Sequence, residues 1–289
     1  MARSQHISAG TELFRWQGYP VTTRDESEAG TPVRSSLVLV VMCAGMFLVL
    51  LDITVVNVAL PAIQTSLHTG ITAAQLVVDG YAVAIAGLLL TGGALGDRIG
   101  HRTMVLFGLG LFAAGSTGCG LAWSVAPLVA GRILQGVGAA LFLPASIAVI
   151  VRAYPERRSQ ARALGVWAGV SALALPAGPL LGGRLVSTAV WRWVFLINPP
   201  VILAAAVGIL AWVPGQRGAG LAHLDLVGTI TSAVMPAALI GAVIAAGHRQ
   251  SALAVSASGL ALAAAAGFWA QERRTPQPLV PFSVFRQPA

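Results

Sequence analysis

The stretch Gly93-Ala94-Leu95-Gly96-Asp97-Arg98-Ile99-Gly100-His101-Arg102 separates two long apolar segments by a short charged turn. The glycines Gly93, Gly96 and Gly100 permit close backbone approach or a positive φ. Asp97 is placed to accept hydrogen bonds at a helix end, and Arg98 and Arg102 favour the cytoplasmic face of a membrane. The stretch therefore predicts two membrane-length helices that are joined directly on the cytoplasmic side.

The composition of the whole chain is that of a membrane protein. Of its 289 residues, 56% are apolar and 10% are charged, and the mean hydropathy is +0.79. A water-soluble globule of this size cannot cover its surface with so few charged residues. The chain has no lysine, so the net charge of +8 comes from arginine. Because these arginines lie in short loops between apolar segments, they indicate membrane topology and not nucleic-acid binding.

Eight apolar segments are long enough to cross a bilayer, for which a helix needs roughly 20 residues. Their uniform apolarity predicts helices, because the strands of a membrane barrel are about ten residues of alternating polarity. The segments are Leu37–Leu60, Ala73–Leu95, Met104–Trp123, Val125–Val151, Ala163–Val186, Trp193–Val213, Leu226–Ala246 and Leu253–Ala270. The sequence thus predicts an all-α integral membrane protein.

Polar stretches divide the chain into five regions. Residues 1–36 are expected to form a disordered cytoplasmic tail and not a cleaved signal peptide. Residues 37–213 hold six helices, and residues 214–225 form a cytoplasmic linker. Residues 226–270 hold two further helices, and residues 271–289 form a second cytoplasmic tail.

The placement of arginine predicts the orientation of the chain. With the N-terminus in the cytoplasm, the inner loops and nearby tails carry twelve arginines and the outer loops carry three. An excess of arginine marks the cytoplasmic side of a membrane. We therefore expect a multi-pass protein of the cell membrane with both termini in the cytoplasm.

Three ionisable residues, Asp52, Asp79 and Arg132, lie well inside the predicted spans. A charge in hydrocarbon costs at least ~2.5 kcal/mol, so it normally faces a cavity or a partner. At about 1.5 Å per residue, Asp52 lies about 12 Å from the outer helix end and the other two about 9 to 10 Å, which permits pairing. We expect a carboxylate near Arg132 that gains and loses a proton, because burial favours the neutral carboxyl and a neighbouring cation favours the charged one.

Less specific interpretations stay open for these residues. Asp52 and Asp79 are alternatively members of a static ion pair, or they cap neighbouring polar groups. Asn57 and Gln135 are candidates to line the same cavity, or they serve only as interhelical hydrogen-bonding groups. The histidines lack the spacing of metal ligands, and no nucleophile has a base beside it. The sequence thus predicts no metal site, no cofactor and no enzymatic activity.

Five stretches resemble motifs of the major facilitator superfamily of secondary transporters, and their order and spacing along the chain strengthen the resemblance. The turn already described resembles the loop after the second helix of that family. Leu51–Pro61 is similar to the motif of the fourteen-helix drug:proton antiporters, and Ala130–Ala140 to the motif whose arginine is associated with proton coupling. Gly178-Pro179-Leu180-Leu181-Gly182-Gly183 resembles the antiporter motif of the fifth helix, and Trp191–Pro200 resembles the start of the sixth.

The motifs are not reproduced at every position. His101 stands where the loop motif usually has arginine, and Gly96 stands where alanine is common. Pro176 adds a second proline to a helix that already contains Pro179, which favours an additional bend. The glycines of the fourth and fifth helices are expected to be close-packing surfaces rather than ligand contacts. They are Gly131, Gly136, Gly138, Gly178, Gly182 and Gly183.

The resemblance implies the six-helix N-terminal half of a major facilitator fold plus two additional transmembrane helices. It implies a proton-coupled antiporter that exports small amphipathic or drug-like compounds, with the proton gradient as its energy source. The implied partners are the lipid bilayer, a small-molecule substrate, protons, and a second half or subunit. We expect the chain to be an N-terminal portion or a truncated product. The alternative is a non-transporting half-bundle that acts as a scaffold or regulatory partner.

Overall fold

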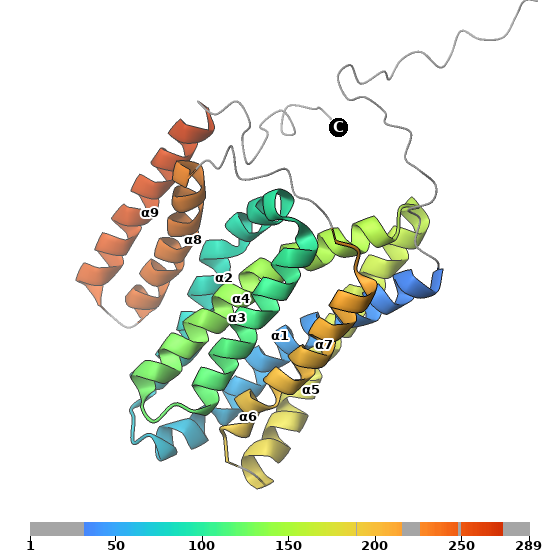
Figure 1. Cartoon of the computed structure of the whole chain (residues 1–289). Helices are drawn as coiled ribbons and strands as arrows, with labels where there is room; N and C mark the ends of the chain where they lie inside the picture. Colours follow the sequence, from blue (N-terminus) through green and yellow to red (C-terminus); the bar gives the residue numbers. More distant parts are fainter. Residues whose placement is uncertain (1–31, 189, 216–225, 248–249, 274–289) are drawn as a thin grey trace, which may run out of the picture.

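The computed structural model describes residues 32–188, 190–215, 226–247 and 250–273, and every regular element among them is a helix (Figure 1). The helices are α1 (Pro32–Ser66), α2 (Ile71–Ile99), α3 (His101–Gly120), α4 (Val125–Ala153), α5 (Arg157–Thr188), α6 (Trp193–Leu196), α7 (Asn198–Trp212), α8 (Leu226–Gly247) and α9 (Ser251–Glu272). Most of the predicted N-terminal tail, linker and C-terminal tail lies outside the described residues.

The eight spans expected from hydropathy are present. Within the described ranges, eight helical stretches are long and apolar enough to cross a membrane. The sixth of them, Trp193–Trp212, contains both α6 and α7 and is interrupted at Ile197. The predicted all-helical membrane architecture is therefore confirmed, with a break in the sixth span that hydropathy did not indicate.

The helices extend beyond the apolar segments that predicted them. α1 begins at Pro32 and not at Leu37, so residues 32–36 belong to a helix and not to a tail, and it continues through Pro61 to Ser66. Hydropathy marks only the residues that lie in hydrocarbon, whereas helical hydrogen bonding continues into the polar interface. The predicted boundary was for this reason too short at both ends of the helix.

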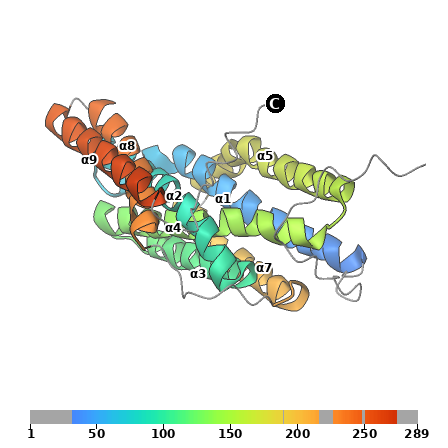
Figure 2. The same ribbon diagram turned by 90° about the horizontal axis from the view of Figure 1, so that it is seen from above.

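α4 is the central helix of the bundle. It packs along α2 on one side and along α3 on the other, and α1 packs along α5. α7 contacts both α1 and α3, and Figure 2 shows α5 and α7 along opposite edges of the bundle. α8 and α9 form a hairpin whose α8 packs against α2, at the left of Figure 1.

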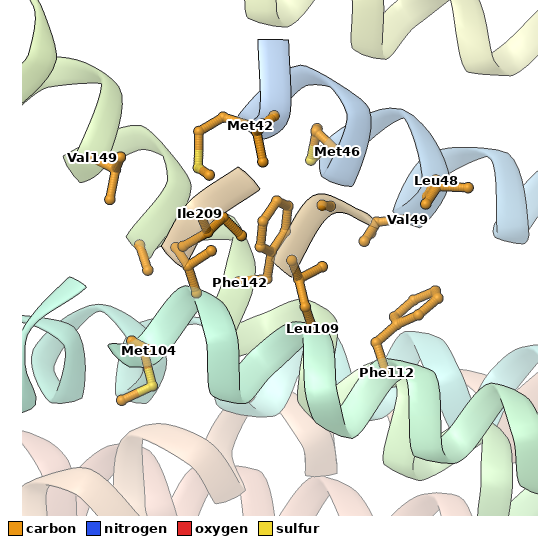
Figure 3. Packing of buried hydrophobic residues seen from close by; sticks show 14 of the residues in the cluster. Met42, Met46, Leu48, Val49, Met104, Leu109, Phe112, Phe142, Val149 and Ile209 are labelled. Carbon is orange, nitrogen blue, oxygen red and sulfur yellow. The ribbon is translucent and has the colours of Figure 1, made fainter. Parts of the chain in front are cut away.

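An apolar core fills the space between α1, α3, α4 and α7. Met42 and Met46 of α1 face Leu109 of α3, Phe142 of α4 and Ile209 of α7 (Figure 3), and all five are buried. Methionine fills irregular gaps because its side chain is long and unbranched. Four helices that are distant in sequence thus meet around one cluster.

Glycines bring the backbones of α3 and α4 into contact. A Cβ atom added to Gly138 would lie 2.5 Å from the carbonyl oxygen of Gly108, and one added to Gly108 would lie 2.7 Å from that of Gly138. Gly115 and Gly131 form a second reciprocal pair, with distances of 2.7 and 2.9 Å. Small residues let transmembrane backbones approach closely. The expected packing role of the glycines in α4 is therefore seen in the structure.

We predict that Gly138→Ala lowers the thermal stability of the purified protein, by about 1–3 kcal/mol, because the added methyl group meets backbone atoms that cannot rotate away. Gly110→Ala, on the adjacent helix, is the matched control, since a Cβ atom there meets nothing within 4 Å. Thermal denaturation in detergent measures both variants. Equal melting temperatures for the two would contradict the close-contact interpretation.

Candidate functional site

The structure brings together Asp52 of α1 and Arg132 of α4, two of the charged residues expected inside the spans. Arg132 Nη1 donates a hydrogen bond to Asp52 Oδ2 in a buried ion pair. The residues are 3% and 1% exposed, respectively. A charge in hydrocarbon requires a partner or a cavity, and in this structure each charge faces the other.

Further groups hold the guanidinium in place. Arg132 Nε donates to the Val77 carbonyl at 3.1 Å, and Nη1 also donates to Gln135 Oε1 at 3.0 Å. The Tyr81 ring lies 4.2 Å from Arg132 Cζ, and the Tyr81 hydroxyl donates to the Val49 carbonyl at 3.2 Å. A cation over an aromatic ring is attracted to it, more strongly when both are desolvated. The arginine is thus fixed from α1, α2 and α4.

The second carboxylate oxygen of Asp52 accepts two more hydrogen bonds. Gln135 Nε2 donates to Oδ1 at 3.1 Å, and Asn198 Nδ2 donates to the same oxygen at 3.3 Å. Asn198 Nδ2 also donates to Ser116 Oγ at 3.0 Å. We call Asp52, Arg132, Gln135, Asn198 and Ser116 the ion-pair network. It connects α1, α3, α4 and α7 through side chains that are all buried.

Sequence reasoning placed two other polar residues near the ion pair. Asn57 is exposed on α1 and is not a member of the ion-pair network, so its place in a cavity shared with Asp52 stays a prediction. Five residues of helix separate the two positions by about 140° around the axis, so their side chains leave α1 in different directions. Asp79 is half-buried on α2, two residues after Val77, whose carbonyl accepts a hydrogen bond from Arg132.

Asn198, Ser116 and Tyr81 are the members of the site that sequence reasoning missed. Each is a polar side chain in an otherwise apolar span, which is a weak signal because such residues commonly serve as interhelical hydrogen-bonding groups. A more specific signal was present at Asn198. It directly precedes Pro199 and Pro200, which interrupt the backbone hydrogen bonding of the sixth span.

The antiporter motif of α5 packs against α1. A Cβ atom on Gly178 would overlap the side chain of Thr54, whose hydroxyl donates to the Ala174 carbonyl at 3.2 Å. A Cβ atom on Gly182 would lie 3.2 Å from Val58, whereas one on Gly183 would meet nothing within 4 Å. The expected close-packing role therefore holds for the first two glycines and is wrong for Gly183.

α5 remains one continuous helix through both of its prolines. Pro176 and Pro179 lie inside Arg157–Thr188, and both are exposed. Neighbouring groups commonly re-satisfy the backbone carbonyls that a proline leaves without a donor in a membrane helix.

The charged turn between α2 and α3 is shorter than the sequence suggested. α2 runs to Ile99 and α3 begins at His101, so Gly100 is the whole connection. Its φ of 102° lies in the region that favours glycine. Gly93, in contrast, has room for a side chain, because a Cβ atom there would lie 3.8 Å from Pro144. The prediction of a special backbone conformation thus holds for Gly100 alone of these two.

The two departures from the loop motif are in contact with each other. A Cβ atom on Gly96 would lie 2.9 Å from His101 Nδ1, so the imidazole occupies the space that an alanine methyl group would need. The other ring nitrogen, Nε2, lies 3.2 Å from Asp97 Oδ1. A side chain at position 96 and the imidazole at position 101 would therefore compete for the same space, so histidine at 101 requires glycine at 96.

Arginines of the turn and of α1 cap the end of α7. Arg102 Nη2 donates to the Leu210 carbonyl at 2.8 Å, and Arg34 Nε donates to the Trp212 carbonyl at 3.0 Å. The last carbonyls of a helix have no helical donor, and cations are favourable there. Together with Arg98 and Arg152, these residues define what we call the arginine-rich end. Arg98 is half-buried on α2.

We predict unequal costs for removing the two members of the ion pair. Asp52→Leu leaves a buried guanidinium that cannot lose its proton, whereas Arg132→Leu leaves a carboxylate that can be neutralised by a proton. Asp52→Leu should cost about 3–5 kcal/mol and Arg132→Leu less, and the double variant should cost less than the sum. Denaturation of the four proteins measures this cycle. Additive costs would contradict a direct pair.

We also predict that Gly96→Ala is tolerated only when His101 is shortened. In the natural background the methyl group meets the imidazole, with an expected loss of about 1–3 kcal/mol. In a His101→Ala background the same change should be neutral or stabilising, because alanine is the better helix former. Gly93→Ala is the control with room for a methyl group. An equal cost of Gly96→Ala in both backgrounds would refute the link.

Comparison with known proteins finds a transporter superfamily and several resistance proteins. A family model described as Major Facilitator Superfamily matches residues 42–216. A methylenomycin A resistance protein of Bacillus subtilis is 36% identical over 252 residues, or 86% of this chain and 54% of the relative. A lincomycin resistance protein of Streptomyces lincolnensis is 37% identical over 265 residues, or 91% and 55%. The chain spans about half the length of the curated relatives it matches.

A solved structure agrees in fold. The crystal structure of the peptide transporter POT in complex with sulfate matches with a TM-score of 0.56 and 16% sequence identity. The match covers 64% of this chain and 41% of that one, and at this identity it concerns the fold alone. The family model, in contrast, covers more than half of the chain, including the first motif, the charged turn and the ion-pair network. The chain therefore belongs to the Major Facilitator Superfamily, a superfamily of transporters and not of enzymes.

Proposed function

We propose that this chain is the N-terminal part of a proton-coupled antiporter that exports small amphipathic or drug-like compounds. The observation that carries the proposal is the ion pair between Asp52 and Arg132, which is buried between α1 and α4, bonded directly to α2 and α7, and bonded through Asn198 to α3. Buried ionisable groups in membrane spans commonly belong to substrate or proton pathways.

Protonation of Asp52 would force the network to rearrange. The carboxylate accepts from Arg132 on one oxygen and from Gln135 and Asn198 on the other. A protonated carboxyl is neutral, so the hydrogen bonds from all three donors lose their charge assistance, and the added O–H needs an acceptor of its own. The guanidinium also loses its counter-charge. A proton is therefore able to convert one stable arrangement of α1 and α4 into another, as alternating access requires.

The names of the relatives supply the substrate class. Relatives with 35–37% identity are called methylenomycin A, lincomycin and multidrug resistance proteins, and another is called a tetracenomycin C resistance and export protein. These names refer to several different compounds. We infer export of small organic compounds and not of one specific metabolite.

We further propose that the arginine-rich end lies in the cytoplasm and that both chain termini are on that side. Three contacts place the starts of α1 and α3 and the ends of α4 and α7 at one end of the bundle. Arg34 and Arg102 bond the end of α7, and Ser35 bonds the Ala153 carbonyl of α4. Arginine-rich helix ends mark the cytoplasmic side. A second six-helix half, supplied by a longer chain or by another subunit, would complete the substrate cavity.

We predict that inverted membrane vesicles containing the protein take up a cationic dye when a proton gradient is imposed. Asp52→Asn and Arg132→Ala should abolish this uptake, because each removes one charge of the ion pair. Glu156→Gln and Arg158→Ala, which make the same charge changes at exposed positions, are the matched controls and should retain it. Dye fluorescence in the external medium is the measurement.

Dye uptake that persists unchanged in both ion-pair variants would contradict the proton-coupling role. A wild-type protein that is inserted in the membrane but gives no dye response, with or without a second half supplied in trans, would favour the non-transporting half-bundle.

A further inference from the structure

The sixth span is interrupted next to the ion-pair network. α6 ends at Leu196 and α7 begins at Asn198. Pro199 follows, and proline has no backbone N–H. The carbonyl of Phe195, four residues before Pro199, therefore has no helical donor at the usual position. A carbonyl without a helical donor in a membrane span must be satisfied by another group.

Ser116 of α3 supplies the missing donor. Its hydroxyl donates to the Phe195 carbonyl at 2.8 Å and accepts from Asn198 Nδ2 at 3.0 Å. The same nitrogen donates to Asp52 Oδ1 at 3.3 Å. Because a side-chain amide nitrogen carries two hydrogens, the two donations are compatible. A continuous chain of hydrogen bonds thus leads from the carboxylate to the break, through side chains that are at most 3% exposed.

We propose that Asn198 is a positioning residue that couples the protonation state of Asp52 to the break in the sixth span, with Ser116 as the intermediate. This inference rests on the proposed function, in which Asp52 takes up the proton. While Asp52 is charged, Asn198 binds it through a charge-assisted hydrogen bond, which is roughly twice as strong as a neutral one. A proton on Asp52 removes that advantage and loosens residues 193–198.

A comparison of Gln135 with Asn198 shows why the sixth span, and not α4, should loosen when Asp52 is protonated. It donates to the same oxygen as Asn198, but it lies within α4, which is helical without interruption from Val125 to Ala153. α6, in contrast, has only four residues and is followed by a proline that cannot continue its hydrogen bonding. Local opening concentrates where few backbone hydrogen bonds must break. When the network changes, the backbone of the sixth span should therefore open before the backbone of α4 does.

Hydrogen exchange of the full chain in lipid nanodiscs tests the proposal. The measured quantity is the protection of amides in residues 193–198, corrected for intrinsic exchange rates, at neutral and at acidic pH. In the wild type we expect protection to fall by roughly tenfold on acidification, in line with the loss of one hydrogen bond to a charged group. Asp52→Asn should give the low protection at both pH values.

Asn198→Leu distinguishes coupling from a merely structural role. A structural role would lower protection yet leave its dependence on pH, whereas coupling through Asn198 requires that the dependence is lost. Ser116→Ala should have the same effect while keeping the bond between Asn198 and Asp52, and it carries the test if Asn198→Leu does not fold. Ser146→Ala is the matched control, because that buried serine bonds only the Leu143 carbonyl of its own helix among the contacts described.

Two results would overturn the proposal: a wild type whose protection does not change with pH, or an Asn198→Leu protein that keeps the wild-type response. Either would leave the proposed function standing if Asp52→Asn still abolishes dye uptake. Conversely, dye uptake that survives Asp52→Asn refutes the proposed function, whatever the exchange experiment shows.

Discussion

The arrangement of the bundle depends on the requirement that a charge buried in hydrocarbon be neutralised and fully hydrogen-bonded. Asp52 and Arg132 meet this requirement together, with donors and acceptors from α1, α2, α4 and α7. Lipid tails are as apolar as leucine, so apolar side chains alone give membrane helices little reason to choose one neighbour over another. A buried polar group is costly when unsatisfied, and its bonds therefore specify the neighbours. The ion-pair network sets which helices meet at this depth.

Close backbone contact makes such a small network possible. The glycine pairs of α3 and α4 bring those backbones together, and a Cβ atom on Gly136 would lie 2.6 Å from the Tyr81 carbonyl of α2. With the helices at this separation, Arg132 on α4 is within reach of the Val77 carbonyl and the Tyr81 ring. Larger residues in place of the glycines would move α2 away from α4. The glycines thus set the separation between the helices, and at that separation the hydrogen bonds of the charged residues determine which helices pack together.

Hydropathy predicted all eight spans, and the rarity of buried charges predicted a carboxylate near Arg132 without deciding between Asp52 and Asp79. The remaining site was not predictable by the same reasoning. Counting residues from a helix end gives the depth of a side chain but not its direction around the axis, so Asn57 was grouped with Asp52 although the two leave α1 on different sides. Asn198 and Ser116 carry no charge, and uncharged polar residues in spans are common enough to be ambiguous. Their role depends on the break at Pro199, which is a backbone feature that hydropathy does not register.

The single-residue connection at Gly100 links this site to the arginine-rich end. α2 and α3 both contact the ion-pair network, through the Val77 carbonyl and Ser116, and Gly100 alone separates them. Two helices joined so tightly cannot slide far past each other, because one residue supplies only two soft torsion angles. A rearrangement around Asp52 that slides α2 or α3 along its axis is therefore transmitted to the turn, where Asp97, His101 and Arg102 bond to one another or to α7. Under the proposed function, proton uptake at Asp52 and the contacts of the arginine-rich end are therefore linked through α2 and α3.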